Sequence, residues 1–451
     1  MKRILVLGAG HSAPYLIHHL LEQASVYGAE VLVADAQADA AAAAVAGHER
    51  GRALGLDVAD EDALRREIAQ ADIAVHLLPP RFQGLIAQEC LRGQTHMVSA
   101  SYISRQVREL SADAASRGLR WLCEMGLDPG MDLMSAKATI ARVQAEGGIV
   151  EGCQSYGGGV PALDAEHNPW RYVVTWNPRN VVMAANHGAQ FLKDGQIRLV
   201  PWQRVFKTTW SVDIPGQATF EAYANRDSLS YRELLGLEQA SVLIRGTLRY
   251  PGWGELWHQM VELGLPNEEL ELPDPASHTY RDLVRMFLPE GSGDVRDRVA
   301  EFLNLDPSGE IMGKLDWLGL FSDQPLQAHH RTPALALADL MKARLVLEPD
   351  ARDAVILHHI FDVRYPASGE RQRVRSTFVA HGDPGGFTAM AKSVGLTAAL
   401  GVEMILRDQV PTAGASIPTE PELYEPLLDE LARHGMGFQE DVQTLGTPVR
   451  P

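Results

Sequence analysis

The sequence predicts an α/β protein in two parts: a parallel sheet with helices at the N-terminus, then a second α/β part with a mixed sheet. Three observations support this prediction. Short apolar runs alternate with helix-forming stretches up to residue 123. Beyond residue 126 the expected strands are longer and carry more aromatic side chains. The length of 451 residues exceeds what one hydrophobic core usually supports.

The first part alternates strands with helices. The expected strands are residues 3–7, 30–34, 52–58, 72–78, 95–99 and 119–123. The expected helices are residues 14–21, 38–46, 60–69 and 82–92, with one more between the last two strands. This alternation predicts parallel strands joined by right-handed crossovers.

The second part has a less regular pattern. Strands are expected at 171–177, at 196–210 and twice within 354–380. Residues 262–310 are polar and mixed, which predicts helices with loops. The two final helices are expected at 388–408 and 421–435.

Charge and composition exclude several classes of partner. The net charge is −17, from 58 acidic and 41 basic residues, so nucleic acid and anionic membranes are not expected to bind.

We find no run of eighteen apolar residues. The apolar start of the chain is interrupted at Gly8, which indicates a strand and turn rather than a signal peptide. Three widely spaced cysteines, Cys90, Cys123 and Cys153, suit reduced thiols in the cytoplasm.

A glycine motif lies between the first strand and the first helix. The residues Gly8, Ala9, Gly10, His11, Ser12 and Ala13 match G-x-G-x-x-A, the fingerprint of a dinucleotide-binding Rossmann domain. Gly8 permits the tight turn, Gly10 lets the backbone approach a pyrophosphate, and Ala13 allows close packing of helix on strand. The helix N-terminus then offers N–H groups to the phosphates. The motif therefore predicts a nicotinamide dinucleotide cofactor.

Asp35 ends the second expected strand, where a carboxylate binds the ribose hydroxyls of NAD and repels the 2′-phosphate of NADP. No arginine follows it, so NAD is the expected cofactor. The alternative is a solvated loop aspartate. The backbone of Leu78 and Pro79, at the end of the fourth strand, is expected to line the same crevice.

Several motifs together resemble one family. In chain order they are Ser99–Ser104, Gly126–Asp132, Ser155–Ala162, Ala224–Ser228, Arg245–Tyr250, Leu315–Leu320 and Met390–Gly395. From about residue 3 to residue 440 the chain resembles saccharopine dehydrogenase of the L-glutamate-forming type, also called saccharopine reductase.

The resemblance implies three segments and a reaction. Residues 1–125 would form the Rossmann domain. Residues 126–387 would form the domain for substrate and dimer contacts, with a helical insertion at about 262–325. Residues 388–451 would form C-terminal helices that return to the first domain. The family joins L-glutamate and 2-aminoadipate 6-semialdehyde as an imine and reduces it to saccharopine, or runs the reverse oxidation. The expected assembly is a homodimer.

The chemistry and the resemblance together suggest site residues. Asp128 and Tyr102 are expected to handle proton transfer. The alternatives are that Asp128 only begins a turn and that Tyr102 only packs at a domain junction. Saccharopine carries three carboxylates, which call for arginines. The alternative for the arginines is pairing with surface carboxylates. The expected substrate contacts are Ser101, Asn225, Arg226, Arg245 and Thr247. The expected cofactor contacts are Gly8, Gly10, His11, Ser12, Ala13, Asp35, Asp57, Leu78, Pro79, Ser101, Leu127 and Asp128.

The sequence departs from the family at two positions. The family usually has an arginine after the second strand that binds the 2′-phosphate of NADP, where this chain has Asp35 and Ala36. The resemblance alone therefore implies NADP as an alternative cofactor. The family also has a cysteine at the position of Gly157, next to Tyr156.

No metal is expected. The adjacent pairs His18–His19, His329–His330 and His358–His359 are not expected to face one site, because neighbouring side chains diverge. Cys153 is expected to be a buried, inert thiol. Two other functions stay open: a carboxynorspermidine-type dehydrogenase of polyamine metabolism and a non-catalytic protein that senses the dinucleotide. The first would favour carboxylates over arginines in its pocket.

Overall fold

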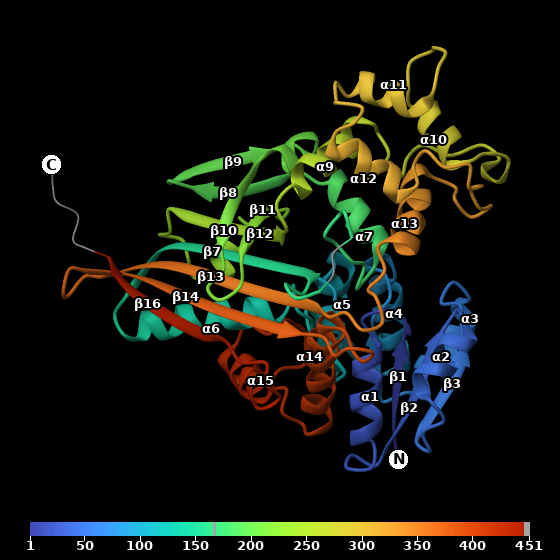
Figure 1. The fold of residues 1–451 in the computed structure, drawn as a ribbon. Helices are drawn as coiled ribbons and strands as arrows, with labels where there is room; N and C mark the ends of the chain where they lie inside the picture. Colours follow the sequence, from blue (N-terminus) through green and yellow to red (C-terminus); the bar gives the residue numbers. More distant parts are fainter. Residues whose placement is uncertain (166–167, 446–451) are drawn as a thin grey trace. The chain divides into compact units, whose positions relative to one another are not determined.

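The computed structural model describes residues 1–165 and 168–445, which form two compact units (Figure 1). Unit 1 comprises residues 1–150 and the segment from Ala354 to the C-terminus, and unit 2 comprises Glu151–Asp353. Residues 446–451, the end of the expected C-terminal segment, lie outside the described residues.

Unit 1 contains a seven-stranded parallel sheet, in the order β15-β6-β5-β4-β1-β2-β3. Its strands are β1 (Lys2–Leu7), β2 (Ala29–Asp35), β3 (Gly51–Gly55), β4 (Ile73–His76), β5 (His96–Ser99), β6 (Arg120–Leu122) and β15 (Gly414–Ser416). The first six strands have the 3-2-1-4-5-6 order of dinucleotide-binding sheets. The predicted parallel Rossmann sheet is confirmed.

In the described ranges of the chain, six helices belong to the same part of unit 1 as this sheet, and they contact one another in two groups of three. The helices are α1 (Pro14–Gln23), α2 (Ala38–Val45), α3 (Glu61–Ile68), α4 (Gln83–Gly93), α5 (Arg105–Ser116) and α14 (Ala389–Leu406), with the 3₁₀ turn η1 (Pro80–Phe82). Helix α1 contacts α2 and α14, and α4 contacts α3 and α5. Side-chain caps fix two helix starts: Asp60 accepts from the N–H of Ala63, and Ser104 accepts from the N–H of Val107. The helices predicted in this region are confirmed to within a few residues.

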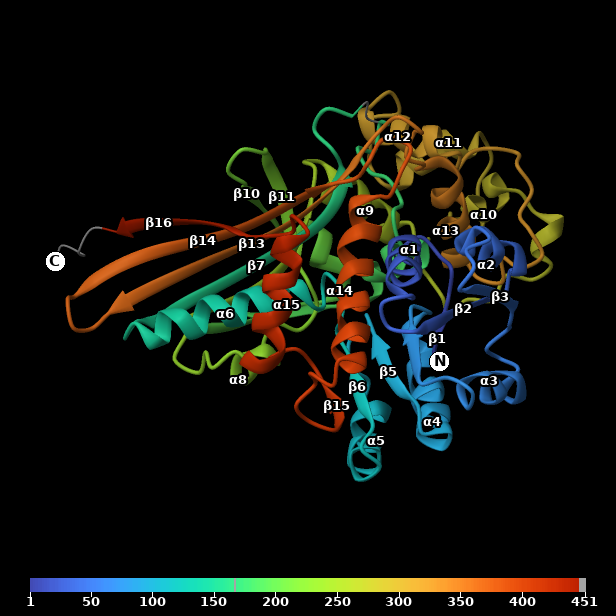
Figure 2. The ribbon, with the colours of Figure 1, turned by 90° about the horizontal axis from the view of Figure 1, so that it is seen from below.

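Helix α14 is long and apolar enough to cross a membrane by length and composition alone. In the structure, however, 83% of it is buried inside the protein. It packs against α1 and lies beside the strands of the parallel sheet (Figure 2). Its apolar composition is therefore explained by its place in the core.

The rest of unit 1 is a helix pair and three antiparallel strands. The helices are α6 (Met131–Ala145) and α15 (Pro421–Arg433), which contact each other. The strands are β13 (Asp353–Tyr365), β14 (Glu370–His381) and β16 (Gln439–Leu445), and β14 pairs with both others. The two strands predicted within 354–380 and the helices predicted at 388–408 and 421–435 are confirmed.

Unit 2 combines a mixed sheet with a group of helices. Strand β12 pairs in parallel with β7 and antiparallel with β11, which gives the mixed character. The strands are β7 (Ile149–Pro161), β8 (Ala189–Lys193), β9 (Gln196–Val200), β10 (Thr209–Asp213), β11 (Thr219–Ala224) and β12 (Val242–Arg249). The helices are α7 (Pro178–Met183), α8 (Tyr231–Leu234), α9 (Trp253–Glu262), α10 (Tyr280–Met286), α11 (Val295–Phe302), α12 (Glu310–Leu318) and α13 (Pro333–Arg344). Short 3₁₀ turns are η2 (Ala184–Asn186), η3 (Trp202–Lys207) and η4 (Pro275–Ser277).

Two strand predictions in unit 2 were wrong. Residues 171–177 form no strand: Arg171 has a left-handed φ of 49°, and the side chain of Asn168 accepts from the N–H of Trp170. The aromatic residues there are buried by packing rather than by strand pairing. Residues 196–210 are divided by η3 into β9 and β10, because the run contains a core-packed turn at Val205 and Phe206.

Candidate active site

The glycine turn has the geometry that the motif predicted. Gly8 has a φ of 105°, and a Cβ there would lie 3.1 Å from the side chain of Leu78. A Cβ at Gly10 would meet nothing within 4 Å, so the backbone faces open space. Ala13 is buried, and Pro14 begins α1. The open face at Gly10 beside a helix N-terminus fits a pyrophosphate.

Asp35 is the last residue of β2 and lies next to the glycine turn. Its Oδ2 accepts from the N–H of Ala9 at 2.8 Å, and its Oδ1 accepts from the N–H of Gln37 at 2.9 Å. A carboxylate has about four acceptor sites, so these two bonds leave capacity for ribose hydroxyls. The carboxylate is therefore held at the position the sequence predicted.

The other predicted cofactor positions cluster at the same edge of the parallel sheet. Asp57 follows β3, next to the end of β2, and accepts from the N–H of Ala59. Leu78 and Pro79 follow β4, and Leu78 lies against Gly8. The order of strands changes direction between β1 and β4, which is where open α/β sheets bind ligands.

Asp128 lies in a turn whose backbone is closely fixed. The N–H of Gly126 donates to the carbonyl of Pro129, and the N–H of Met131 donates to the carbonyl of Gly126. Gly130 has a φ of 144°, and a Cβ there would lie 2.2 Å from the carbonyl oxygen of Gly126, so only glycine fits. The turn therefore sets the direction of the Asp128 side chain.

Tyr102 and Asp128 meet directly. The Tyr102 hydroxyl donates to Oδ1 of Asp128 at 2.7 Å, and both side chains are half-buried. Tyr102 comes from the loop after β5, and Asp128 from the turn after β6. Ser101 and Leu127, both predicted cofactor contacts, precede them in the chain. Two separately predicted residues thus form one hydrogen-bonded pair within unit 1.

Four of the five predicted substrate residues lie together in unit 2, namely Asn225, Arg226, Arg245 and Thr247, whereas Ser101 lies in unit 1. The N–H of Asn225 donates to the carbonyl of Arg245 at 2.8 Å, so the segment after β11 runs beside β12. Arg245 is buried, and its guanidinium lies 4.3 Å from the ring centre of Tyr231. Thr247 is two residues further along β12 and therefore on the same face. It pairs in register with Gly157, the position where the family has cysteine.

Arg226 differs from Arg245 in its surroundings. It is exposed, with a left-handed φ of 49°. Within the described residues, no carboxylate lies at ion-pair distance from Arg226 or from the buried Arg249. Arg249 instead lies over the rings of Tyr172 and Trp253. Pairing with surface carboxylates, the alternative stated for Arg226, is not observed among the described residues.

Comparisons with known proteins agree with this geometry. A family model described as "Saccharopine dehydrogenase NADP binding domain" matches residues 4–122, and one described as "Saccharopine dehydrogenase C-terminal domain" matches residues 126–436. A protein from Schizosaccharomyces pombe named "Saccharopine dehydrogenase [NADP(+), L-glutamate-forming]" is 30% identical over 98% of this chain and 99% of its own. The chain belongs to the saccharopine dehydrogenase family.

Two yeast comparisons extend this result. A protein of the same name from Saccharomyces cerevisiae is 32% identical over 97% of this chain and 99% of its own. A solved structure of apo saccharopine dehydrogenase (L-Glu forming) from that yeast covers 98% of this chain and 100% of its own, with a TM-score of 0.84 and 29% identity. The resemblance stated from the sequence motifs is confirmed. The domain built on the parallel sheet binds a nicotinamide dinucleotide.

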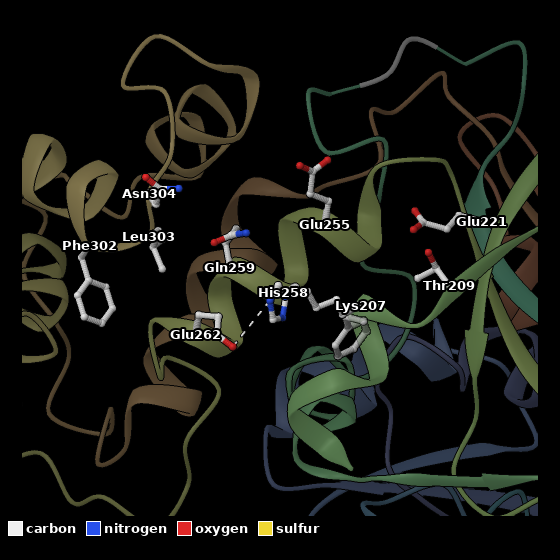
Figure 3. A pocket seen from close by; sticks show the side chains of 11 residues that line it. Lys207, Thr209, Glu221, Glu255, His258, Gln259, Glu262, Phe302, Leu303 and Asn304 are labelled. Atoms are coloured by element: carbon white, nitrogen blue, oxygen red, sulfur yellow. Dashed lines mark ion pairs between the residues drawn. The ribbon is translucent and has the colours of Figure 1, made fainter. Parts of the chain in front are cut away.

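The chain also has a cavity of about 560 Å³ within unit 2 (Figure 3). Four of its lining residues form the polar face of α9: Glu255, His258, Gln259 and Glu262. Glu221 also lines it and accepts from the N–H groups of Gly252 and Gly254. None of the predicted site residues lines this cavity. Three glutamates against one lysine do not suit a tricarboxylate, so the cavity is not the expected substrate pocket.

The three cysteines of this family member are free and buried. Burial raises the pKa of Cys153 to about 12, and the charge of Arg245 lowers it by less. Cys153 is therefore an unreactive thiol at neutral pH, as expected.

One histidine expectation fails. Nε2 of His329 and Nε2 of His330 lie 2.6 Å and 3.0 Å from the same oxygen, Oδ2 of Asp339, so these neighbours do face one point. The three residues could hold a metal ion by geometry. However, Nδ1 of His330 accepts from the N–H of Gln327, so its Nε2 carries the proton donated to Asp339. That tautomer leaves Nε2 without a lone pair for a metal.

Proposed function

We propose that this chain interconverts saccharopine with L-glutamate and 2-aminoadipate 6-semialdehyde, in lysine metabolism, by hydride transfer with a nicotinamide cofactor. Full-length similarity to proteins with this printed activity carries the proposal. The open glycine turn, the Tyr102–Asp128 pair and the arginines near β12 supply the groups that the reaction needs.

Asp128 is the proposed general base. It takes the proton from the substrate's secondary ammonium, which must be lost before a hydride can leave the neighbouring carbon. A nicotinamide cofactor held at the glycine turn and Asp35 would supply the hydride acceptor. Tyr102 donates to Oδ1 of Asp128, so it orients the carboxylate and stabilises its charge. Arg226 and Arg245, with Asn225 and Thr247, are the proposed contacts to the substrate carboxylates, and Ser101 is a proposed contact next to Tyr102.

NAD(H) is the proposed cofactor, although the relatives' printed names specify NADP(+). Asp35 and Asp57 place two carboxylates at neighbouring strand ends, and neither Ala36 nor Gln37 offers a positive charge. A 2′-phosphate there would be repelled.

The assembly and location are also proposals. Residues 126–387 are the proposed source of the substrate and dimer contacts, and the chain is proposed to act as a cytoplasmic homodimer. Buried free cysteines suit a reducing compartment. Ile197 and Leu199 on β9 are strongly exposed, at 61% and 70%, which suits a surface covered by a second copy.

A steady-state assay tests the proposed activity. Saccharopine with NAD should give glutamate and reduced cofactor, and carboxynorspermidine should give no turnover. Turnover of carboxynorspermidine alone would favour the polyamine alternative. Tight dinucleotide binding without turnover of either compound would favour the sensing alternative.

A further inference from the structure

The loop that carries Tyr102 is held on one side by Gln83, the first residue of α4. The Gln83 side chain is fully buried. Its Oε1 accepts from the N–H of Ser104 at 2.8 Å. Its Nε2 donates to Oγ of Ser99 at 3.0 Å and lies 3.5 Å from the carbonyl oxygen of Ser101. One side chain therefore joins the start, the middle and the end of the loop.

Glu124 holds the same loop from the other side. Its backbone N–H donates to the carbonyl of Ser101 at 3.2 Å, and its Oε1 accepts from the N–H of Ile103 at 3.1 Å. Only 3% of Glu124 is exposed, and its φ of 60° lies in the left-handed region. The two residues that flank Tyr102 are thus both bonded to Glu124.

This arrangement is energetically expensive. The left-handed conformation is unfavourable for a non-glycine residue, and a buried polar side chain must recover its lost hydration through hydrogen bonds. Sites where such costs are concentrated are often functional. Here the bonds converge on residues 99–104, the segment that presents Tyr102 to Asp128.

We infer that Gln83 and Glu124 are positioning residues that hold the Tyr102 hydroxyl on Asp128. Neither needs to touch the substrate. The inference rests on the proposed roles of Tyr102 and Asp128. A displacement of about 1 Å at a reacting group can cost about 100-fold in rate, so a fixed loop matters for this pair.

A double-mutant cycle tests the inference. The variants are Gln83→Met, which keeps the approximate shape but removes the hydrogen bonds, Tyr102→Phe, and the double variant. Gln83→Met should lower kcat about tenfold and leave the KM for the dinucleotide within about twofold. In the Tyr102→Phe background the same change should lower kcat less than twofold further, because residues that act through one another are not additive.

The outcomes separate the two proposals. If Tyr102→Phe leaves kcat unchanged, the proposed role of Tyr102 is wrong, and the inference falls with it. If Tyr102→Phe lowers kcat and Gln83→Met multiplies that loss, only the positioning inference is overturned. If Gln83→Met lowers both the melting temperature and the affinity for the dinucleotide, the positioning inference is also overturned, because that result indicates a purely structural role.

Four further variants complete the experiment. Ser99→Ala removes one of these connections, the acceptor for Nε2 of Gln83, with a smaller change in volume, and it replaces Gln83→Met if that variant does not fold. Glu124→Gln keeps an acceptor for the N–H of Ile103 and should retain kcat within about threefold, whereas Glu124→Ala should not. The exposed Gln70 supplies the matched control, and Gln70→Met should leave kcat unchanged.

Discussion

Two carboxylates carry the cofactor preference and the proton transfer proposed for this protein. Asp35 combines two backbone hydrogen bonds with a place at the end of β2, so its carboxylate is fixed where a ribose would lie. Asp128 is fixed in the same way by a turn that only glycine can close. Both proposed roles therefore belong to residues whose positions the backbone determines.

The cofactor preference is the first prediction. NAD(H) should be preferred over NADP(H) by at least about tenfold in kcat/KM, on the order of 1.4 kcal/mol. Asp35→Ser should reduce that ratio about tenfold, because it removes the repulsion of the 2′-phosphate. Asp39→Ser, at an exposed position in α2, is the control. Equal or better use of NADP(H) by the unaltered protein would contradict the prediction.

The role of Asp128 is the second prediction. Asp128→Asn keeps the shape and removes the base, so kcat should fall about 10²–10⁴-fold. Dinucleotide affinity and melting temperature should barely change. Asp113→Asn, an exposed change on α5, should have no effect. A kcat within a few-fold, or a parallel loss of stability, would move the proton transfer to Tyr102 or to bound water.

Substrate anchoring is the third prediction. Arg226→Ala should raise the KM for saccharopine about 10- to 100-fold, which corresponds to losing a hydrogen bond between charged groups. The dissociation constant of the dinucleotide should stay within about twofold. The exposed Arg198 on β9 provides the control variant Arg198→Ala. If dinucleotide affinity fell as much as substrate affinity, the assignment of Arg226 would be wrong.

Between elements, α1 and α14 are joined by a buried carboxylate. Oε1 of Glu403 lies 2.8 Å from Nε2 of His19, and its Oε2 accepts from the hydroxyl of Tyr27 at 2.8 Å. Burial alone raises the pKa of Glu403, but these hydrogen bonds and the charge of Arg407 bring it below the usual value. The folded state therefore favours the ionised form.

The pH dependence of this contact is the fourth prediction. A lowered pKa in the folded state stabilises the protein at pH values above the usual glutamate pKa of about 4.3. This stabilisation is lost as the pH falls through the folded-state pKa. Glu403→Gln should therefore lower the free energy of unfolding by about 2 kcal/mol at pH 7. The difference should shrink below about pH 4.

Chemical denaturation at pH 7 and at values below about pH 4 measures the difference in unfolding free energy between Glu403→Gln and the unaltered protein. Glu422→Gln, exposed at the start of α15, should behave like the unaltered protein. A difference that stays constant down to pH 3 would show that the ionised form of Glu403 contributes nothing.

At the scale of the whole molecule, the fifth prediction concerns assembly. Light scattering after size exclusion should give about twice the chain mass of 49.4 kDa. If β9 lies in the interface, Leu199→Lys should shift the distribution toward the single chain, because it places a charge at an exposed apolar position. Arg198→Ala serves again as the control. A mass of one chain for the unaltered protein would contradict the homodimer proposal.

The sequence by itself determined the parallel sheet, the glycine turn, the place of Asp35 at the end of a strand, and the family. These features depend on local patterns: apolar residues that recur with a regular period, glycines at a fixed spacing, and a carboxylate at a strand end. The same reasoning failed for residues 171–177, because packing of Tyr172 in the core replaced strand pairing there. Apolar and aromatic composition signals burial, but it does not say which kind of burial.

Only the tertiary structure decided which distant residues meet. The contact between Tyr102 and Asp128 spans 26 positions, and Asn225 runs beside Arg245 although 20 positions separate them. Gln83 and Glu124 carry no sequence signal, because a glutamine at a helix start and a glutamate after a strand usually lie in solvent. Their burial depends on the loop they bind, and that loop is built by strands from separate parts of the chain. Non-local pairing of this kind has no period to detect in a sequence.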